Sequence, residues 1–189
     1  MAVPKHTSDI FELLSKGQFI CSNSGKDATR KLYNIIDENF DDLHDYFSSI
    51  NFILEKGDEY FMFTREENKA DLERKLEAAF KWIDILDFFK TVDHSFGPGY
   101  RFTPSDILVK LAVDVNLKNK LEGLKKYSGG KEKHAEILDK VLDQLRRDNF
   151  IELENEISNS YKALASFHYL ERLILSINIS ESVKNEIPE

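Results

Sequence analysis

The segment Ser24-Gly25-Lys26-Asp27 is the part of the chain closest to a nucleotide-binding signature. A phosphate-binding loop needs a first glycine five residues before the second one, and a serine or threonine directly after the lysine. Ile20 and Asp27 occupy these two positions here. We therefore interpret the segment as a turn followed by the start of a helix, and we expect no nucleotide cofactor.

The other reactive side chains also lack a catalytic or metal-binding spacing. Cys21 is the only cysteine, which excludes a disulfide within the chain and favours a small core residue over a nucleophile. Asp41, Asp42 and Asp45 are typical of a solvated helix face. No two histidines have the spacing of metal ligands among His6, His44, His94, His134 and His168. The sequence predicts a protein that is not an enzyme and holds no metal.

Composition indicates an intracellular globular protein. The 189 residues are 41% hydrophobic and 32% charged, and they include fourteen Phe and seven Tyr. No apolar run could span a bilayer, and the first residues contain no signal peptide, so we expect a cytoplasmic protein without a membrane partner. Because the net charge is −8, any contact with DNA needs a local basic patch.

Hydrophobic periodicity predicts helices and then a hairpin in the first half. A helix should follow the cap at residues 7–9, and a second should run over residues 28–38. A third should begin near Asp41 and turn Leu43, Phe47 and Ile50 inward. The period then changes, and residues 52–63 read as two strands around a turn. This order is typical of a winged-helix module, a helix-turn-helix variant with a β-hairpin wing.

The second half repeats the order helix, strand, helix, helix, hairpin. Its longest helix is expected over residues 69–90, with an inner stripe formed by Leu72, Leu76, Ala79, Phe80, Ile83 and Leu86. Thr103 should cap a helix that opens at Pro104. A lysine-rich linker is expected to end at Gly130, before a helix over residues 131–147.

Two strands, at residues 150–153 and 161–165, and a last helix complete the second half. The predicted fold class is mainly α with small β-hairpins, arranged as tandem winged-helix domains. The first domain covers residues 1–66 and the second covers residues 67–179, with a loose polar tail at residues 180–189.

The helix over residues 131–147 carries the candidate DNA-binding surface, because it takes the place of a recognition helix. The candidate residues are Arg146, Arg147, Lys131, Lys133 and Lys140. Glu136, Asp139 and Asp143 interleave with them, so the expected contact is weak and independent of sequence. A solubilising surface with cations at the helix end is the alternative.

The candidate partner-binding surface is the hairpin strand Tyr60, Phe61, Met62 and Phe63, which is apolar at every position. A half-exposed strand needs apolar side chains on one face only. We interpret one face as covered by a partner protein. The alternative is that both faces pack within the chain, against the helix over residues 69–90.

Five segments carry a family resemblance that covers nearly all of the chain. They are residues 36–40, the helix at residues 42–50, the hairpin at residues 51–64, Phe102-Thr103 at the opening of a helix, and Leu142-Asp143-Gln144-Leu145-Arg146-Arg147 before an apolar strand. In these segments the chain resembles the MukE family, and within it the MksE-like subunits of bacterial condensin-type SMC complexes. Asp148-Asn149 stands where the family has a glycine after the double arginine, and the following strand is more acidic.

The resemblance implies a non-enzymatic accessory subunit that dimerises and binds the kleisin. Through the kleisin it acts on an SMC ATPase that organises chromosomal DNA in the nucleoid. Trp82, Phe88, Phe89 and Phe96 exceed what one small domain core needs, which also favours a homodimer. Two alternatives are a subunit of a Wadjet-type plasmid-defence complex and a stand-alone winged-helix transcription regulator. The acidic charge disfavours the regulator.

Overall fold

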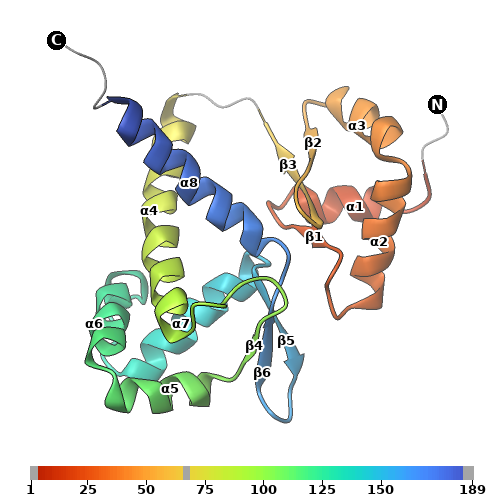
Figure 1. Cartoon of the computed structure of the whole chain (residues 1–189). Helices are drawn as coiled ribbons and strands as arrows, with labels where there is room; N and C mark the ends of the chain where they lie inside the picture. Colours follow the sequence, from red (N-terminus) through yellow and green to blue (C-terminus); the bar gives the residue numbers. More distant parts are fainter. Residues whose placement is uncertain (1–3, 66–68, 185–189) are drawn as a thin grey trace.

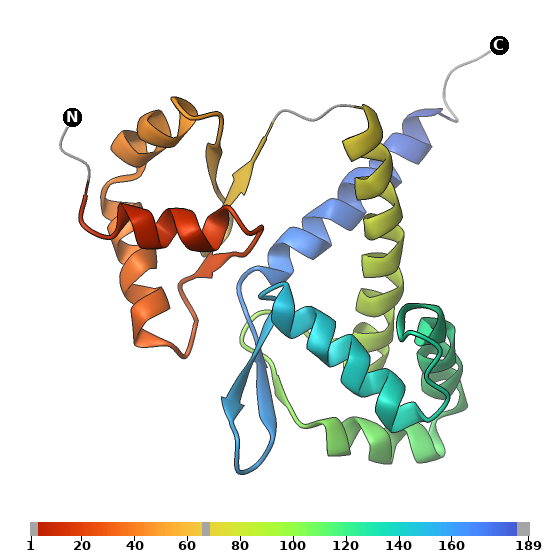
Figure 2. The same ribbon diagram turned by 180° about the vertical axis from the view of Figure 1, so that it is seen from behind.

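The computed structural model describes residues 4–65 and 69–184. The chain forms two units, each with helices packed on one small antiparallel sheet (Figure 1). Seen from both sides, the first unit lies beside α8 and the β5–β6 hairpin of the second unit (Figures 1 and 2). The prediction of a mainly helical chain with small hairpins is confirmed. The predicted domain boundary lies at residues 66–67, outside the described residues.

The first unit holds three helices and one three-stranded sheet. Its elements are α1 (Thr7–Leu14), β1 (Ile20–Cys21), α2 (Asp27–Glu38), α3 (Phe40–Ser48), β2 (Ile53–Lys56) and β3 (Tyr60–Thr64). The strand order is β1-β3-β2, so β3 is the central strand. Leu43, Phe47 and Phe61 are fully buried in its core. Ile50 is 45% exposed, contrary to expectation, because α3 ends at Ser48 before it reaches that position.

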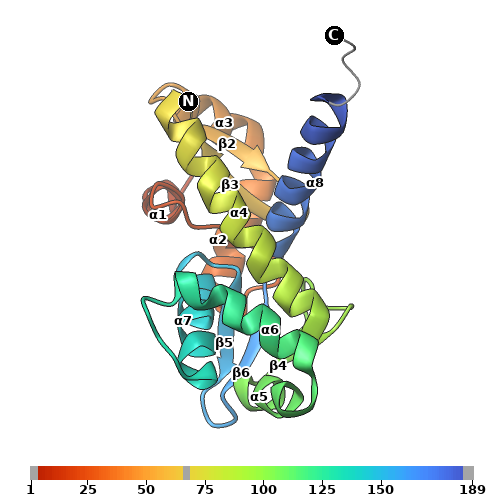
Figure 3. The ribbon, with the colours of Figure 1, turned by 90° about the vertical axis from the view of Figure 1, so that its left-hand side faces the viewer.

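The second unit repeats this arrangement with additional helices. Its elements are α4 (Lys69–Val92), β4 (Arg101–Phe102), α5 (Pro104–Val113), α6 (Val115–Gly123), the 3-10 helix η1 (Leu124–Tyr127), α7 (His134–Arg147), β5 (Ile151–Asn155), β6 (Ser160–Ala163) and α8 (Phe167–Lys184). The strand order is β4-β6-β5. The start of α4 and the end of α8 lie at the same end of the molecule (Figure 3).

The cap predicted at Thr103 is confirmed in this unit. The hydroxyl of Thr103 accepts a hydrogen bond of 3.2 Å from the Asp106 N–H, which caps α5. Asn149, with φ 57°, follows the end of α7 in the left-handed conformation that asparagine tolerates. The apolar stripe of α7 is buried throughout, at Ile137, Leu138, Val141, Leu142 and Leu145. These elements were predictable because short sequence signals determine them.

Three other predictions were wrong. Phe80 is 56% exposed, because α4 buries a face centred on Ile85 and Phe89 instead. The expected linker before Gly130 is helical, since α6 and η1 bury Leu117, Leu121 and Leu124 at helical spacing. Residues 180–184, expected in the loose tail, continue α8 to Lys184, and residues 185–189 lie outside the described residues.

The four aromatic residues that were expected to exceed the needs of one domain core belong to the core of the chain. Phe88, Phe89 and Phe96 are fully buried and Trp82 is 9% exposed. Phe89 packs on Phe88, on Phe96 with 4.6 Å between ring centres, and on Phe102 of β4, whereas Trp82 packs on Phe150. Their number therefore gives no support to a homodimer, and the homodimer stays a prediction. In the part of the chain that the structure describes, no helix is long and apolar enough to cross a bilayer.

Candidate partner-binding and nucleic-acid surfaces

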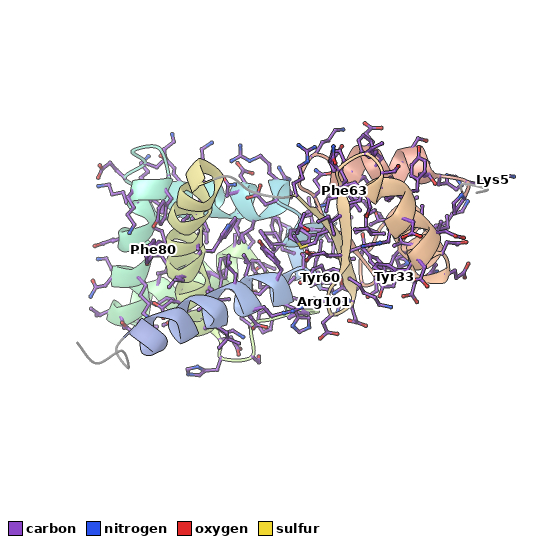
Figure 4. All side chains as sticks on the ribbon, turned by 90° about the horizontal axis from the view of Figure 1, so that it is seen from above. Lys5, Tyr33, Tyr60, Phe63, Phe80 and Arg101 are labelled. Carbon is purple, nitrogen blue, oxygen red and sulfur yellow. The ribbon has the colours of Figure 1, made fainter. Side chains whose placement is uncertain are left out.

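The sheet of the first unit is packed on both faces at its centre. Phe61 points into the core of the first unit, while Tyr60 joins the core of the second. Tyr60 packs on Phe19 with ring centres 5.5 Å apart, and Phe19 packs on Phe150 and Tyr169 at 5.3 Å each. Tyr60 accordingly lies between the two units (Figure 4). The two cores therefore meet through the strands of the first sheet.

Polar contacts fix the loop after β1 to the second sheet. The side-chain amide of Asn23 donates to the Ala163 carbonyl (3.3 Å), and its oxygen accepts from the Ala165 N–H (2.9 Å). In the opposite direction, the Asn149 amide donates to the Phe19 carbonyl (3.2 Å). Because each bond joins a side chain of one unit to the backbone of the other, the orientation of the units is well defined.

Glu152 of β5 occupies the turn that resembled a phosphate loop. Its carboxylate accepts hydrogen bonds from the Ser24 hydroxyl (3.0 Å) and from the Gly25 N–H. The Lys162 ammonium lies 3.3 Å from the same carboxylate, and both side chains are buried. A methyl group at Gly25 would come within 2.8 Å of a Glu152 oxygen, so a larger residue there would displace this carboxylate. The turn and the start of α2 are as predicted, with an acidic group from the other unit at the helix N-terminus.

The acidity of the second hairpin is largely neutralised within the chain. Arg101 of β4 binds Glu154 through two nitrogens, at 2.6 and 2.8 Å. These hydrogen bonds lower the pKa of Glu154, and Lys162 adds to the effect from 3.6 Å. The acidic residues of this hairpin therefore hold the sheet and the two units together.

A cavity of about 380 Å³ opens between the two units beside β3. Its lining residues include Phe19, Phe52, Met62, Phe63, Trp82, Phe150 and Tyr169. Strand β1 pairs only with Tyr60 and Phe61, so in the described chain the β3 edge beyond them has no strand neighbour. The cavity thus combines aromatic walls with a short free strand edge, which is the chemistry that binds extended peptides.

The structure divides the four candidate partner-binding residues into two pairs. Tyr60 is 3% exposed and Phe61 is fully buried, whereas Met62 and Phe63 are half-buried and line the cavity. For the first pair, both faces of the strand pack within the chain, as the alternative reading expected. The covering helix is α8 rather than α4, since Tyr169 contacts Tyr60. Only Met62 and Phe63 offer surface to a partner.

The candidate DNA-binding residues lie at separate places along α7. Lys131 and Lys133 precede its start and share Glu136, at 3.6 and 3.9 Å. Arg146 and Arg147 end the helix, which spans about 21 Å over its 14 residues. Lys140 lies exposed between these ends. The residues therefore do not form one compact cluster.

Acidic neighbours balance this helix. Residues 131–148 contain five Lys or Arg and five Asp or Glu. Arg146 lies 3.4 Å from Asp143, and Arg147 donates to Gln144 at 2.9 Å. A phosphate would have to compete with these contacts, so the surface suits weak binding at most.

Sequence reasoning missed two basic residues that tertiary packing brings near the arginines. Lys26 of the first unit and Arg146 line a common cavity of about 280 Å³. Lys81 of α4 lies 5.3 Å from the Trp82 ring, and burial lowers its pKa, as does Arg147 nearby. Neither lysine shares a sequence segment with the arginines, so no local pattern could have indicated them.

The catalytic candidates remain without the setting of an active site. Cys21 is buried, and burial raises the pKa of its thiol to about 11, so the thiolate is scarce at neutral pH. No group of three or more metal-ligating side chains occurs within residues 4–65 and 69–184.

The fold and its inter-unit cavity define a mainly helical, two-unit protein with surfaces suited to macromolecular contact. The family model for the condensin complex protein MksE matches residues 5–174, and the chain therefore belongs to this family and is a condensin complex subunit. A comparison with curated proteins finds no match.

Proposed function

We propose that the chain is the kleisin-binding accessory subunit of a bacterial condensin-like SMC complex, without catalytic activity of its own. Family membership supports this proposal. Each unit has the element order and the three-stranded sheet of a winged-helix module, with α3 and α7 at the recognition-helix positions. We therefore propose tandem winged-helix domains acting in the cytoplasm, at the nucleoid.

The inter-unit cavity is the proposed kleisin contact, and it is the observation that carries the proposal. An extended kleisin segment would place an apolar side chain against Met62 and Phe63, and its backbone along the free end of β3. The SMC ATPase is then reached indirectly, through the kleisin. The fixed joint between the units keeps the cavity formed before the segment arrives, which lowers the cost of binding.

Substitution of Met62 tests this contact, because the Met62 side chain is half-buried at the cavity wall. Met62→Glu places a charge in the aromatic cavity, while Met62→Leu keeps an apolar side chain of similar volume. With the kleisin co-expressed, we expect the parent and Met62→Leu to capture it and Met62→Glu to lose it. Equal capture by both variants, with both folded, would place the kleisin elsewhere.

Contact with DNA is proposed as weak and independent of sequence. It would use Arg146 and Arg147 at one end of α7, with Lys131, Lys133 and Lys140 along the helix. The balanced charge of residues 131–148 supports a minor contribution to a complex whose main contacts are with protein. It also disfavours a transcription regulator, which needs a basic face that reads bases.

A role in plasmid defence, within a Wadjet-type complex, is compatible with the same subunit and kleisin surface. Deletion of the gene separates the two roles. Loss of chromosome partition with normal plasmid retention supports the chromosomal role, and increased plasmid retention with normal partition supports defence.

A further inference from the structure

The outer edge of β2 is open for the addition of another strand. The Gly57 N–H donates to the Tyr60 carbonyl at 2.8 Å, and this pair closes the β2–β3 hairpin. Hydrogen-bonded pairs alternate along an antiparallel ladder, so Glu55 pairs with Met62 through the backbone. The backbone N–H and C=O groups of Leu54 and Lys56 therefore point away from β3, toward the open edge.

The other sheet edges are shorter or covered. Strand β1 packs against α1 and α2, and β4 has only two residues. The loop at Ser24 and Gly25 reaches β5 at Glu152. Strand β2 packs against α3, but within the described residues no backbone hydrogen bond is made by the outward N–H and C=O groups of Leu54 and Lys56. An open edge of this kind invites pairing with another chain.

Exposed apolar side chains accompany this edge. Tyr46, Ile50 and Ile53 are 37%, 45% and 38% exposed, at the end of α3 and the start of β2. A cavity of about 340 Å³ lies beside them and is lined by Ser48, Asn51, Ile53 and Arg65. An added strand would cover these side chains while its backbone paired with Leu54 and Lys56, which is how edge strands bind peptides with side-chain selectivity.

The charge of the residues around β2 indicates which kind of peptide segment would bind at this edge. Residues 32–65 contain eight Asp or Glu against two Lys or Arg, of which Lys56 is held by Asp37 at 2.6 Å and Arg65 stacks on the Phe52 ring at 3.9 Å. A second copy of this chain, paired antiparallel through Leu54 and Lys56, would set Glu55 directly opposite its own copy, and like charges in that position repel. A segment with lysine or arginine is attracted instead.

We propose that the β2 edge binds an extended segment of the partner protein as a fourth strand, with alternate apolar side chains toward α3 and flanking lysine or arginine residues. The inference rests on the proposed function, in which this partner is the kleisin. It adds a second contact on the first unit, separate from the cavity at Met62.

Lys56→Pro tests the edge, with Lys56→Ala as its matched control. Both variants lose the ion pair with Asp37, but only proline removes the outward N–H and blocks the approach of a strand. The hydrogen bonds between β2 and β3 are kept, because Lys56 and Phe61 form a pair without backbone hydrogen bonds. With co-expressed kleisin, we expect Lys56→Pro to weaken affinity about tenfold or more and Lys56→Ala to change it less than about threefold.

Hydrogen exchange on the parent complex gives a second readout that needs no variant. The amides of Leu54 and Lys56 should gain protection when the kleisin binds, while the Glu55 amide is protected already. Binding of the kleisin without added protection at Leu54 and Lys56, or equal affinity for Lys56→Pro and Lys56→Ala, overturns strand addition and leaves the proposed function standing. If the parent does not bind the kleisin, both proposals fall.

Discussion

The Glu152 carboxylate contacts three groups where the two units meet. They are the Ser24 hydroxyl, the Gly25 backbone N–H and the buried Lys162 ammonium. Its removal would leave Lys162 buried with only Glu154 nearby, and Ser24 and Gly25 without their acceptor. Loss of one member of a buried charged network is strongly unfavourable, because the remaining groups are already desolvated.

We expect Glu152→Ala to lower the free energy of unfolding by about 2–4 kcal/mol. Glu156 belongs to the same hairpin and is exposed. Glu156→Ala should therefore change the free energy of unfolding by less than about 0.5 kcal/mol. Urea titration followed by circular dichroism measures both values. Similar small effects from the two variants would show that Glu152 does not hold the units together.

The thiol of Cys21 gives a pH-dependent prediction at the same scale. Burial raises the pKa of this thiol to about 11, from 9.0 for an exposed cysteine, so the folded chain keeps the proton over a range in which the unfolded chain loses it. The stabilisation is therefore complete below about pH 9 and is lost as the pH rises toward 11. We expect slow reaction with a thiol reagent at pH 8 until denaturant is added.

The comparison with Cys21→Ala isolates this contribution, because other groups titrate in the same range. Between pH 9 and 11 the free energy of unfolding should fall more steeply for the parent than for Cys21→Ala. Parallel pH profiles for the two proteins, or fast labelling of the folded parent at pH 8, would contradict the buried position of the thiol.

Among the elements, α7 carries the predicted DNA contact. Replacing Arg146 and Arg147 with Glu should weaken binding to every duplex alike, because phosphate contacts carry no sequence information. The slope of log affinity against log salt should flatten by about two units, one for each lost contact. Fluorescence anisotropy over a salt series measures this. Binding equal to that of the parent, or a loss confined to one sequence, would refute the contact.

Elements that follow short local signals could be predicted from the sequence. The Thr103 cap, the buried stripe of α7 and the hairpin around Gly57 each depend on residues within one or two turns of chain. The predicted inner stripe of α4 was right at Ala79 and Leu86 and wrong at Phe80, because apolar residues lie on several faces of this helix and packing selects which are buried. Helix α6 was missed because frequent lysines masked its leucine spacing.

The candidate site was predictable only in part, for a similar reason. The sequence indicated that Tyr60 to Phe63 were too apolar for an exposed strand, but it could not show that α8 covers Tyr60 from the other side. The contact of Glu152 with Ser24 joins residues 128 positions apart, so no local pattern reports it. Contacts between units depend on how the units dock.

For the whole molecule, the homodimer remains a prediction, and two exposed side chains offer a place to test it. Phe80 on α4 is 56% exposed and lies far from the first unit (Figure 4), and Leu175 on α8 is 60% exposed. We expect light scattering to give twice the chain mass of 22.0 kDa, and Phe80→Asp to reduce it to the monomer.

Val113→Asp is the matched control for the dimer, because Val113 on α5 is 84% exposed and the same charge is introduced there. It should leave the mass unchanged. A parent that is monomeric across micromolar to near-millimolar concentrations would contradict the homodimer, and dissociation by Val113→Asp alone would place the interface on α5.

Kleisin binding is tested most directly by the mass of the complex that this chain forms with a kleisin subunit of a condensin-like complex. The two proteins are co-expressed and analysed by size-exclusion chromatography with light scattering at low salt. We expect the two proteins to co-elute in one peak whose mass includes both. Met62→Glu should disrupt this complex. Separate elution, with this chain folded and apart from the kleisin, would contradict its role as a kleisin-binding condensin subunit.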